Sequence, residues 1–254
     1  MVFKALRSSK VIKKMRTESI EGSDNRKVVQ LHYSSICPFS RMVRIALLEQ
    51  KYEVHLVEEA YVHDNHEILA INPLGTLPFM VFQGNVVIKN LWSIIDYLIN
   101  TNDASRHTVM PSFFKNFERA EILFNVEWFC TKFFNEVTLP IIQQKIINFT
   151  TRRAPPNSTS IRNALRNMHI HMEYLKLSLA ESNYIESSMP TIADYSAAAQ
   201  LSILDYTGDI MWNSINKRIK GWYSLIKSRS SFRAVLRDRI LSLSPPSHYE
   251  DPDF

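Results

Sequence analysis

Short apolar runs alternate with helix-like segments in the first part of the chain. Four runs have the length and the β-branched or aromatic content of strands, namely 28–33, 53–57, 79–82 and 86–88. Three segments rich in good helix formers lie between and after them, namely 38–51, 66–71 and 91–99. Gly84-Asn85 separates the last two apolar runs, as in a hairpin turn. The pattern predicts the order strand, helix, strand, helix, hairpin, helix.

The second part of the chain shows helical periodicity alone. Residues 113–137 carry a broad apolar stripe typical of a long helix, which 139–149 either extends or kinks after Pro140. Further helices are predicted at 160–179, 191–206, 213–227 and 230–239. Met168 and Met172 have the spacing of core residues, whereas His169 and His171 point to different helix faces and make a poor metal pair. No metal site is expected.

Thr191 and Asp194 have the spacing of a helix capping box. Thr191 is expected to cap the helix, and Asp194 to bond back from its third position. Three alanines at 197–199 would let neighbouring helices approach closely. This segment is interpreted as a folding element without chemistry of its own.

Composition and charge limit the classes of partner. The 254 residues are 45% hydrophobic, which suits one or two domains with a substantial core. No apolar run approaches ~18 residues, so membrane insertion is not expected. Two cysteines cannot form a disulfide framework, which agrees with a reducing compartment. The net charge of +5 lies entirely within residues 1–27, so the remainder is neutral and gives no reason to expect a nucleic-acid partner.

Residues 1–27 are interpreted as a basic, disordered extension. They lack the apolar core of a secretory signal, which argues against export. Two alternatives remain for this stretch. In the first, residues 1–27 are an organellar transit peptide. In the second, the start is misassigned and translation begins at Met15.

Cys37 is the main candidate for chemistry. It follows the first predicted strand, and Pro38 fits the first turn of the next helix because a proline lacks an N–H that the helix would leave unpaired. Free backbone N–H groups and the helix dipole would stabilise a thiolate there and depress the pKa of Cys37. The alternative is a buried, inert cysteine.

These motifs resemble the glutathione transferase superfamily over both halves of the chain. The resemblance implies an α+β, thioredoxin-like domain at 28–101, a linker at 102–111 and an all-α domain at 112–243. It also implies a cis peptide bond before Pro78, which holds the backbone at Leu77 open for a peptide thiol. Active members usually carry an acid-serine pair where this chain has Asn90 and Leu91. Losing those contacts costs about 1–3 kcal/mol each, so only a remnant glutathione site is expected, at Leu77, Pro78 and Asn90.

The last residues, 244–254, are proline-rich and acidic and are called the tail. Their Pro-Pro-x-His-Tyr-x-Asp-x-Asp-Phe pattern resembles the FzlA family of alphaproteobacterial cell-division proteins. The resemblance implies a cytoplasmic homodimer at the division site that binds the tubulin-like FtsZ, with a tail that activates the septal wall synthesis machinery. The tail is expected to be exposed, non-helical and free of core contacts. Its predicted partner-binding residues are His248, Tyr249, Glu250, Asp251, Asp253 and Phe254.

Two functions follow from these observations. The first is a division factor without glutathione transferase activity. The second is an omega-like thiol transferase, in which a Cys37 thiolate attacks a mixed disulfide of glutathione. Residues 213–239, which include the last two predicted helices, also hold eight basic residues and little acid. They are interpreted as a solvated face or, alternatively, as a surface for an acidic partner.

Overall fold

The computed structural model describes residues 28–61, 66–82, 86–101, 109–110, 114–151, 155–179, 182–240 and 243–254. The chain divides into two compact units after Thr108, within the predicted linker 102–111. The predicted basic extension, the hairpin turn at 84–85 and most of the predicted linker lie outside the described residues.

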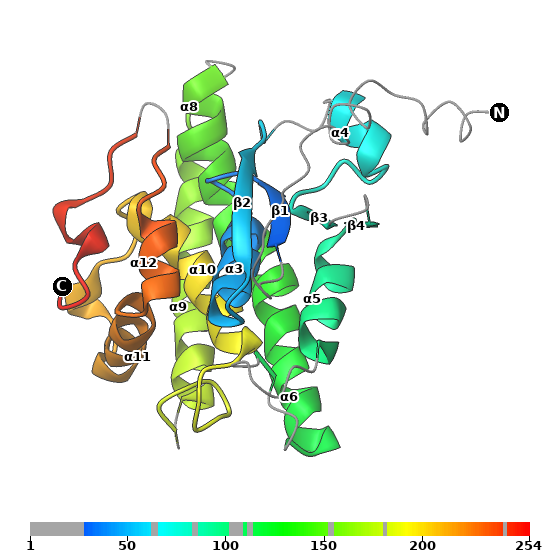
Figure 1. Ribbon diagram of the computed structural model, residues 1–254. Helices are drawn as coiled ribbons and strands as arrows, with labels where there is room; N and C mark the ends of the chain where they lie inside the picture. The colour runs from blue at the N-terminus through cyan, green and yellow to red at the C-terminus, as the bar shows by residue number, and fades with distance from the viewer. Residues whose placement is uncertain are drawn as a thin grey trace. The chain divides into compact units, whose positions relative to one another are not determined.

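The first unit is built on a four-stranded mixed sheet in the order β2-β1-β3-β4 (Figure 1). Strand β1 pairs parallel with β2 and antiparallel with β3, and β3 pairs antiparallel with β4. Its elements are β1 (Val28–Tyr33), α3 (Pro38–Glu49), β2 (Glu53–Glu58), α4 (His66–Ile71), β3 (Phe79–Phe82), β4 (Val86–Ile88) and α5 (Leu91–Asn100). The predicted order is confirmed, and every boundary falls within two residues of its predicted position.

Position in the sheet explains the composition of its strands. The central strand β1 has buried apolar side chains, and α3 packs against this strand. Strand β2 lies at the sheet edge and exposes Glu53, His55 and Glu58. Exposed charges on an edge strand disfavour pairing with another chain.

The second unit is helical. Its first elements form one continuous helical run through Pro140, comprising α6 (Asn116–Glu127), η3 (Trp128–Thr138), α7 (Leu139–Ile141), η4 (Ile142–Ile147) and α8 (Asn148–Thr151). Segments η3 and η4 are π-helical, with the wider i→i+5 spacing. The remaining elements are α9 (Ser158–Ser178), α10 (Ile192–Tyr206), η5 (Trp212–Ser214), α11 (Lys217–Lys227), α12 (Ser230–Leu236) and η6 (Ser247–Glu250).

Helix α10 forms the core of the second unit. All 15 of its residues are buried, and it packs against α6, η3 and α11. The predicted capping box is confirmed, since the Thr191 N–H donates to Asp194 Oδ2 at 2.8 Å. In α9, the prediction that Met168 and Met172 are core residues is confirmed, and His171 is buried while His169 is exposed.

Candidate functional site

The first unit brings Cys37 together with the backbone around Pro78. Cys37 is the N-cap residue of α3 and Pro38 is at the first turn, as predicted. The Cys37 Sγ lies 3.7 Å from the carbonyl oxygen of Leu77. The peptide bond between Leu77 and Pro78 is cis, which confirms the prediction.

Burial disfavours the thiolate form of Cys37. The residue is 0% exposed, and burial raises the pKa of its thiol. Hydrogen bonds from Ser40 and from the Phe39 N–H, together with the charge of Arg41, lower this pKa but do not outweigh burial. The predicted depression of the Cys37 pKa is therefore wrong. The start of α3 supplies the expected N–H donors. The buried position, however, would deprive a Cys37 thiolate of contact with water.

Two further groups at this end of the sheet were missed by sequence analysis. Burial raises the pKa of Tyr61, and a charge on Cys37 raises it further, so the phenol and the thiol share one environment. His32 Nδ1 lies 2.8 Å from Glu59 Oε1, and burial lowers the pKa of this histidine. Their closeness to Cys37 could have been inferred from the order of the strands. Residues that follow two adjacent parallel strands, here β1 and β2, meet at the same edge of the sheet.

Asn90 makes local contacts. It caps α5, with its Oδ1 accepting the Ser93 N–H at 2.9 Å, and Leu91 begins the helix with an apolar side chain. Helix capping thus occupies the amide oxygen of Asn90. Among the described residues there is also no group of three or more histidines, cysteines or carboxylates placed to hold a metal ion.

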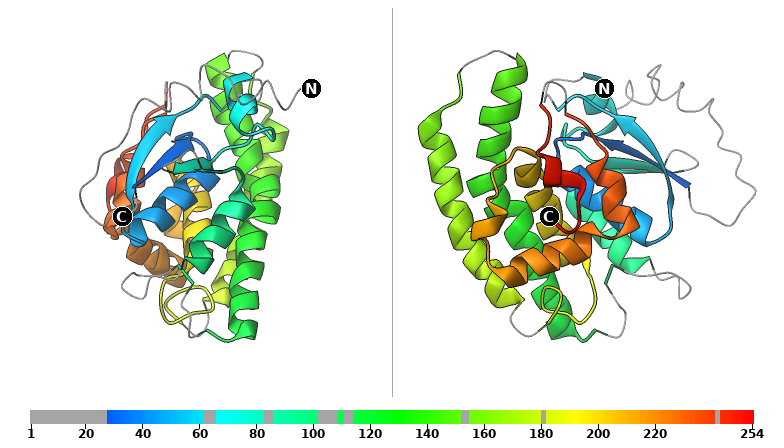
Figure 2. Two further views of the ribbon diagram at one scale, coloured as in Figure 1. Left: turned by 45° about the vertical axis from the view of Figure 1, so that its right-hand side comes forward. Right: turned by 90° about the vertical axis from the view of Figure 1, so that its left-hand side faces the viewer.

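The tail is docked on the second unit, against α11 and α12 (Figure 2). Tyr249 is fully buried, with its ring centroid 5.0 Å from that of Tyr206. The Phe254 ring lies 4.6 Å from that of Trp212. The expectations that the tail makes no core contacts and contains no helix are wrong, since η6 is a short 3₁₀ helix within it.

A buried ion pair anchors the docked tail. Lys227 and Asp205 are both 0% exposed, and Lys227 Nζ lies 3.5 Å from Asp205 Oδ2. Lys227 Nζ also donates to the His248 carbonyl at 2.9 Å and lies 3.9 Å from the centroid of the Phe254 ring. His248 Nε2 lies 3.0 Å from Asp205 Oδ1, so both ends of the pair contact the tail.

This pair changes the interpretation of the basic helices. Lys217, Arg218 and Arg233 are exposed, as expected of a solvated face, but Lys227 is not. Burial lowers the pKa of Lys227, and the charges of Asp205 and Asp251 oppose that shift. Lys227 is a structural cation, and the sequence pattern could not distinguish it from its exposed neighbours.

The acidic side chains of the tail remain at the surface. Glu250, Asp251 and Asp253 are exposed, and Glu250 pairs with Arg239. The Asp253 N–H donates to Asp251 Oδ1 at 2.9 Å. The docked tail therefore divides its predicted partner-binding residues into an inner set, which holds the tail in place, and an outer acidic set.

Comparisons with known proteins agree with this architecture. The family model for the glutathione S-transferase N-terminal domain matches residues 31–106. FtsZ-localized protein A from Caulobacter vibrioides (strain NA1000 / CB15N) is 32% identical over 228 residues, which cover 88% of this chain and 97% of that protein.

Solved structures give the same result. FzlA from C. crescentus has a TM-score of 0.83 and 31% identity, over 89% of this chain and 99% of that chain. A glutathione S-transferase from Rhodospirillum rubrum F11 has a TM-score of 0.82 and 34% identity, over 89% of this chain and 100% of that chain. The chain therefore belongs to the glutathione S-transferase superfamily and, within it, to the family of FtsZ-localized protein A.

Proposed function

We propose that this chain is a cytoplasmic cell-division factor that binds FtsZ and helps to activate septal wall synthesis, without glutathione transferase activity. The observation that carries the proposal is the relationship to FtsZ-localized protein A, which extends over 97% of that protein. We further propose that the chain acts as a homodimer at the division site. Among the described residues, no helix has the length and apolar character to cross a bilayer.

The geometry at Cys37 supports a role without thiol chemistry. A thiolate is the nucleophile in disulfide exchange, and burial disfavours the thiolate here. Asn90 and Leu91 supply neither a carboxylate nor a hydroxyl for the charged ends of a γ-glutamyl group. At these two positions the site beside the cis peptide bond before Pro78 therefore has neither a carboxylate nor a hydroxyl, which supports a role without glutathione.

The docked tail supports a role in partner binding. Its inner contacts fix the backbone, so Glu250, Asp251 and Asp253 are presented from an ordered surface. An ordered surface loses less conformational entropy on binding than a disordered one. The proposed partner of these carboxylates is the septal wall synthesis machinery, and FtsZ is proposed to bind elsewhere on the folded chain.

Neutralising two of the three outer carboxylates separates binding to FtsZ from activation of septal wall synthesis. We expect the intact chain to co-sediment with FtsZ polymers, and the double variant Glu250→Gln/Asp253→Asn to co-sediment equally well. The same variant should fail to support septation in cells that depend on this protein. The matched control is Glu121→Gln/Glu127→Gln, which removes two exposed carboxylates from α6 and should support septation normally.

Each half of this experiment can fail independently. An intact chain that does not pellet with FtsZ polymers would refute the proposed FtsZ binding. Normal septation with the tail variant would show that Glu250 and Asp253 serve no partner.

Thiol transfer is the second candidate, favoured by the 3.7 Å approach of the Cys37 Sγ to the Leu77 carbonyl beside Pro78. Thiol transfer requires a reactive thiolate at Cys37. We expect iodoacetamide at pH 7.5 to alkylate Cys37 at least about tenfold more slowly in the native chain than in the chain unfolded in urea. Peptide mass spectrometry measures this rate, and the buried Cys130 provides an internal reference. Native labelling of Cys37 faster than in urea would favour the thiol transferase.

A further inference from the structure

Buried His171 joins helix α9 to the π-helical segment η3 through both of its ring nitrogens. Its Nδ1 lies 3.1 Å from the indole Nε1 of Trp128, and its Nε2 lies 3.0 Å from Glu136 Oε2. The His171 side chain is 1% exposed, so these two partners, rather than water, satisfy its hydrogen bonds. We call His171, Trp128 and Glu136 the His171 cluster.

The partners of His171 dictate where its proton lies. An indole N–H can only donate a hydrogen bond, so His171 Nδ1 must accept it through a lone pair. The single ring proton of the neutral imidazole is then on Nε2, from which it is donated to the Glu136 carboxylate. The protonated imidazole would carry a hydrogen on Nδ1 as well. Two N–H donors would then face each other across the 3.1 Å between Nδ1 and the indole nitrogen.

The indole that binds His171 also belongs to a partly exposed aromatic surface. Trp128 stacks on Tyr174 with 4.0 Å between the ring centroids, and the Phe124 ring lies 6.2 Å from the Trp128 ring. Phe124 is 52% exposed, and Trp128 and Tyr174 are half-buried. Movement of the Trp128 indole would therefore change the shape of this surface.

Two charged side chains of η3 act on His171. The Glu136 carboxylate favours the protonated imidazole and the Lys132 ammonium disfavours it, but burial is the largest influence and lowers the pKa of His171. Glu136 keeps its charge in this range, because its hydrogen bond with Lys132 is the largest of the effects that lower the Glu136 pKa below 4.5.

The other elements that pack against α9 place no further charge beside His171. Helix α7 has no titratable side chain. Helix α11 meets α9 at Leu179, whose carbonyl accepts a hydrogen bond from Arg218 about two turns beyond His171. On α9 itself, Glu173 and Lys176 pair with each other.

We propose that the His171 cluster is a pH-sensitive switch, in which neutral His171 holds the Trp128 indole against α9 and protonated His171 releases it, so that the surface of Phe124, Trp128 and Tyr174 rearranges. The fold favours the neutral form, so the indole is held above pH ~6.5 and is released as the pH falls below that value. The switch uses no residue of the tail or of the Cys37 site and is independent of the proposed function.

NMR spectroscopy of the full chain tests the release of the indole. The indole N–H resonance of Trp128, identified by its loss in Trp128→Phe, should shift between pH ~7.5 and ~5, with a midpoint below about 6.5. His171→Asn offers the indole an oxygen acceptor that does not titrate, so this shift should disappear. The Trp222 indole is the internal reference. It bonds to Asp194 and should respond to pH equally in both proteins.

A second measurement does not require the His171 variant. Trp128→Phe removes the N–H that opposes protonation and keeps a ring beside Tyr174, so the His171 pKa should rise by about 0.5 or more. The matched control Trp92→Phe changes an exposed tryptophan of the first unit and should leave the His171 pKa within about 0.2 of its original value. The Cε1–H resonance of His171 reports this pKa.

Three results would overturn the proposal. The first is a Trp128 indole resonance that does not respond to pH between ~7.5 and ~5. The second is the same response in a folded His171→Asn variant. The third is a His171 pKa that Trp128→Phe leaves unchanged.

Discussion

At the scale of single residues, Asp194 connects three parts of the helical unit. Its carboxylate accepts hydrogen bonds from the loop at Ile185, the capping residue Thr191 and the indole of Trp222. Burial nevertheless raises the pKa of Asp194 from 3.8 to about 6. Desolvation of the charged form is therefore the larger effect, and the four donated bonds offset only part of it.

This raised pKa fixes the sign of a pH effect on stability. The folded chain holds a proton on Asp194 more tightly than the unfolded chain does, so the contribution is complete below pH ~4 and is lost as pH rises through about 6. The difference in free energy of unfolding between wild type and Asp194→Asn should fall by about 2 kcal/mol between pH 4 and 7. Urea unfolding at several pH values measures it.

The comparison with Asp194→Asn cancels the titration of all other groups. If that variant does not fold, Asp194→Ser provides another side chain that does not titrate in this range. A difference that rises with pH would contradict the prediction, because it would mean that the hydrogen bonds depress the Asp194 pKa.

At the scale of elements, the tail is an integral part of the helical unit. It contributes a buried aromatic ring at Tyr249 and a terminal ring at Phe254, which contacts Trp212, Tyr223 and Lys227. Ser224 in α11 donates a further hydrogen bond to the Pro252 carbonyl. Removal of the tail would also open a route for water to the buried Lys227.

The terminal ring gives a direct test of docking. Phe254→Ala should lower the free energy of unfolding by about 1–2 kcal/mol, less than for a fully buried phenylalanine because Phe254 is half-buried. Asp253→Ala, at the exposed neighbouring position, should change it by less than about 0.5 kcal/mol. Urea unfolding compares the two variants. Equal effects would show that the tail does not dock in solution.

At the scale of the whole molecule, local patterns predicted the fold better than the sites. Strands and helices follow from periodicities that span only a few residues, and the Thr191–Asp194 cap lies within one helical turn. The order of elements could therefore be predicted, as could the position of Cys37 at a helix start.

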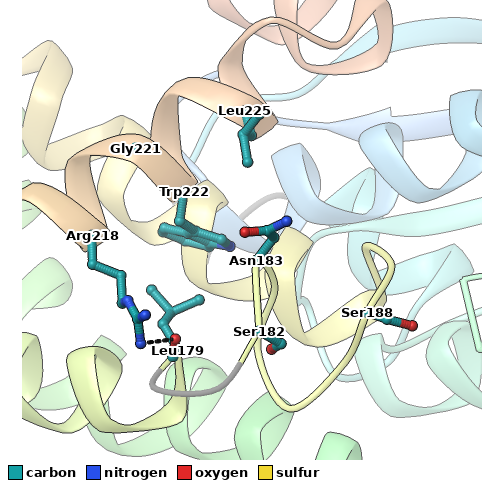
Figure 3. Close-up of a pocket in the computed structure, with 8 residues that line it drawn as sticks. All are labelled: Leu179, Ser182, Asn183, Ser188, Arg218, Gly221, Trp222 and Leu225. Carbon is teal, nitrogen blue, oxygen red and sulfur yellow. Dashed lines mark hydrogen bonds between the residues drawn. The ribbon is translucent and has the colours of Figure 1, made fainter.

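Properties that depend on distant parts of the chain could not be predicted in the same way. The burial that raises the Cys37 pKa comes from the packing of whole elements around the helix start. Lys227 reaches Asp205 across 22 positions in sequence, and His248 reaches it across 43. A pocket lined by Ser182, Asn183 and Trp222 likewise arises where the loop 182–190 meets α11 (Figure 3). None of these arrangements leaves a periodic signal in the sequence.

The buried pair of Asp205 and Lys227 also constrains how the sequence can diverge. Loss of either partner leaves an unpaired charge in the core, which typically costs about 3–5 kcal/mol, whereas replacement of both by apolar residues of similar volume is often neutral. Descendant sequences should therefore retain both charges or lose both. Because the tail is held by these same two side chains, residues 205, 227 and 248 are expected to covary as one group.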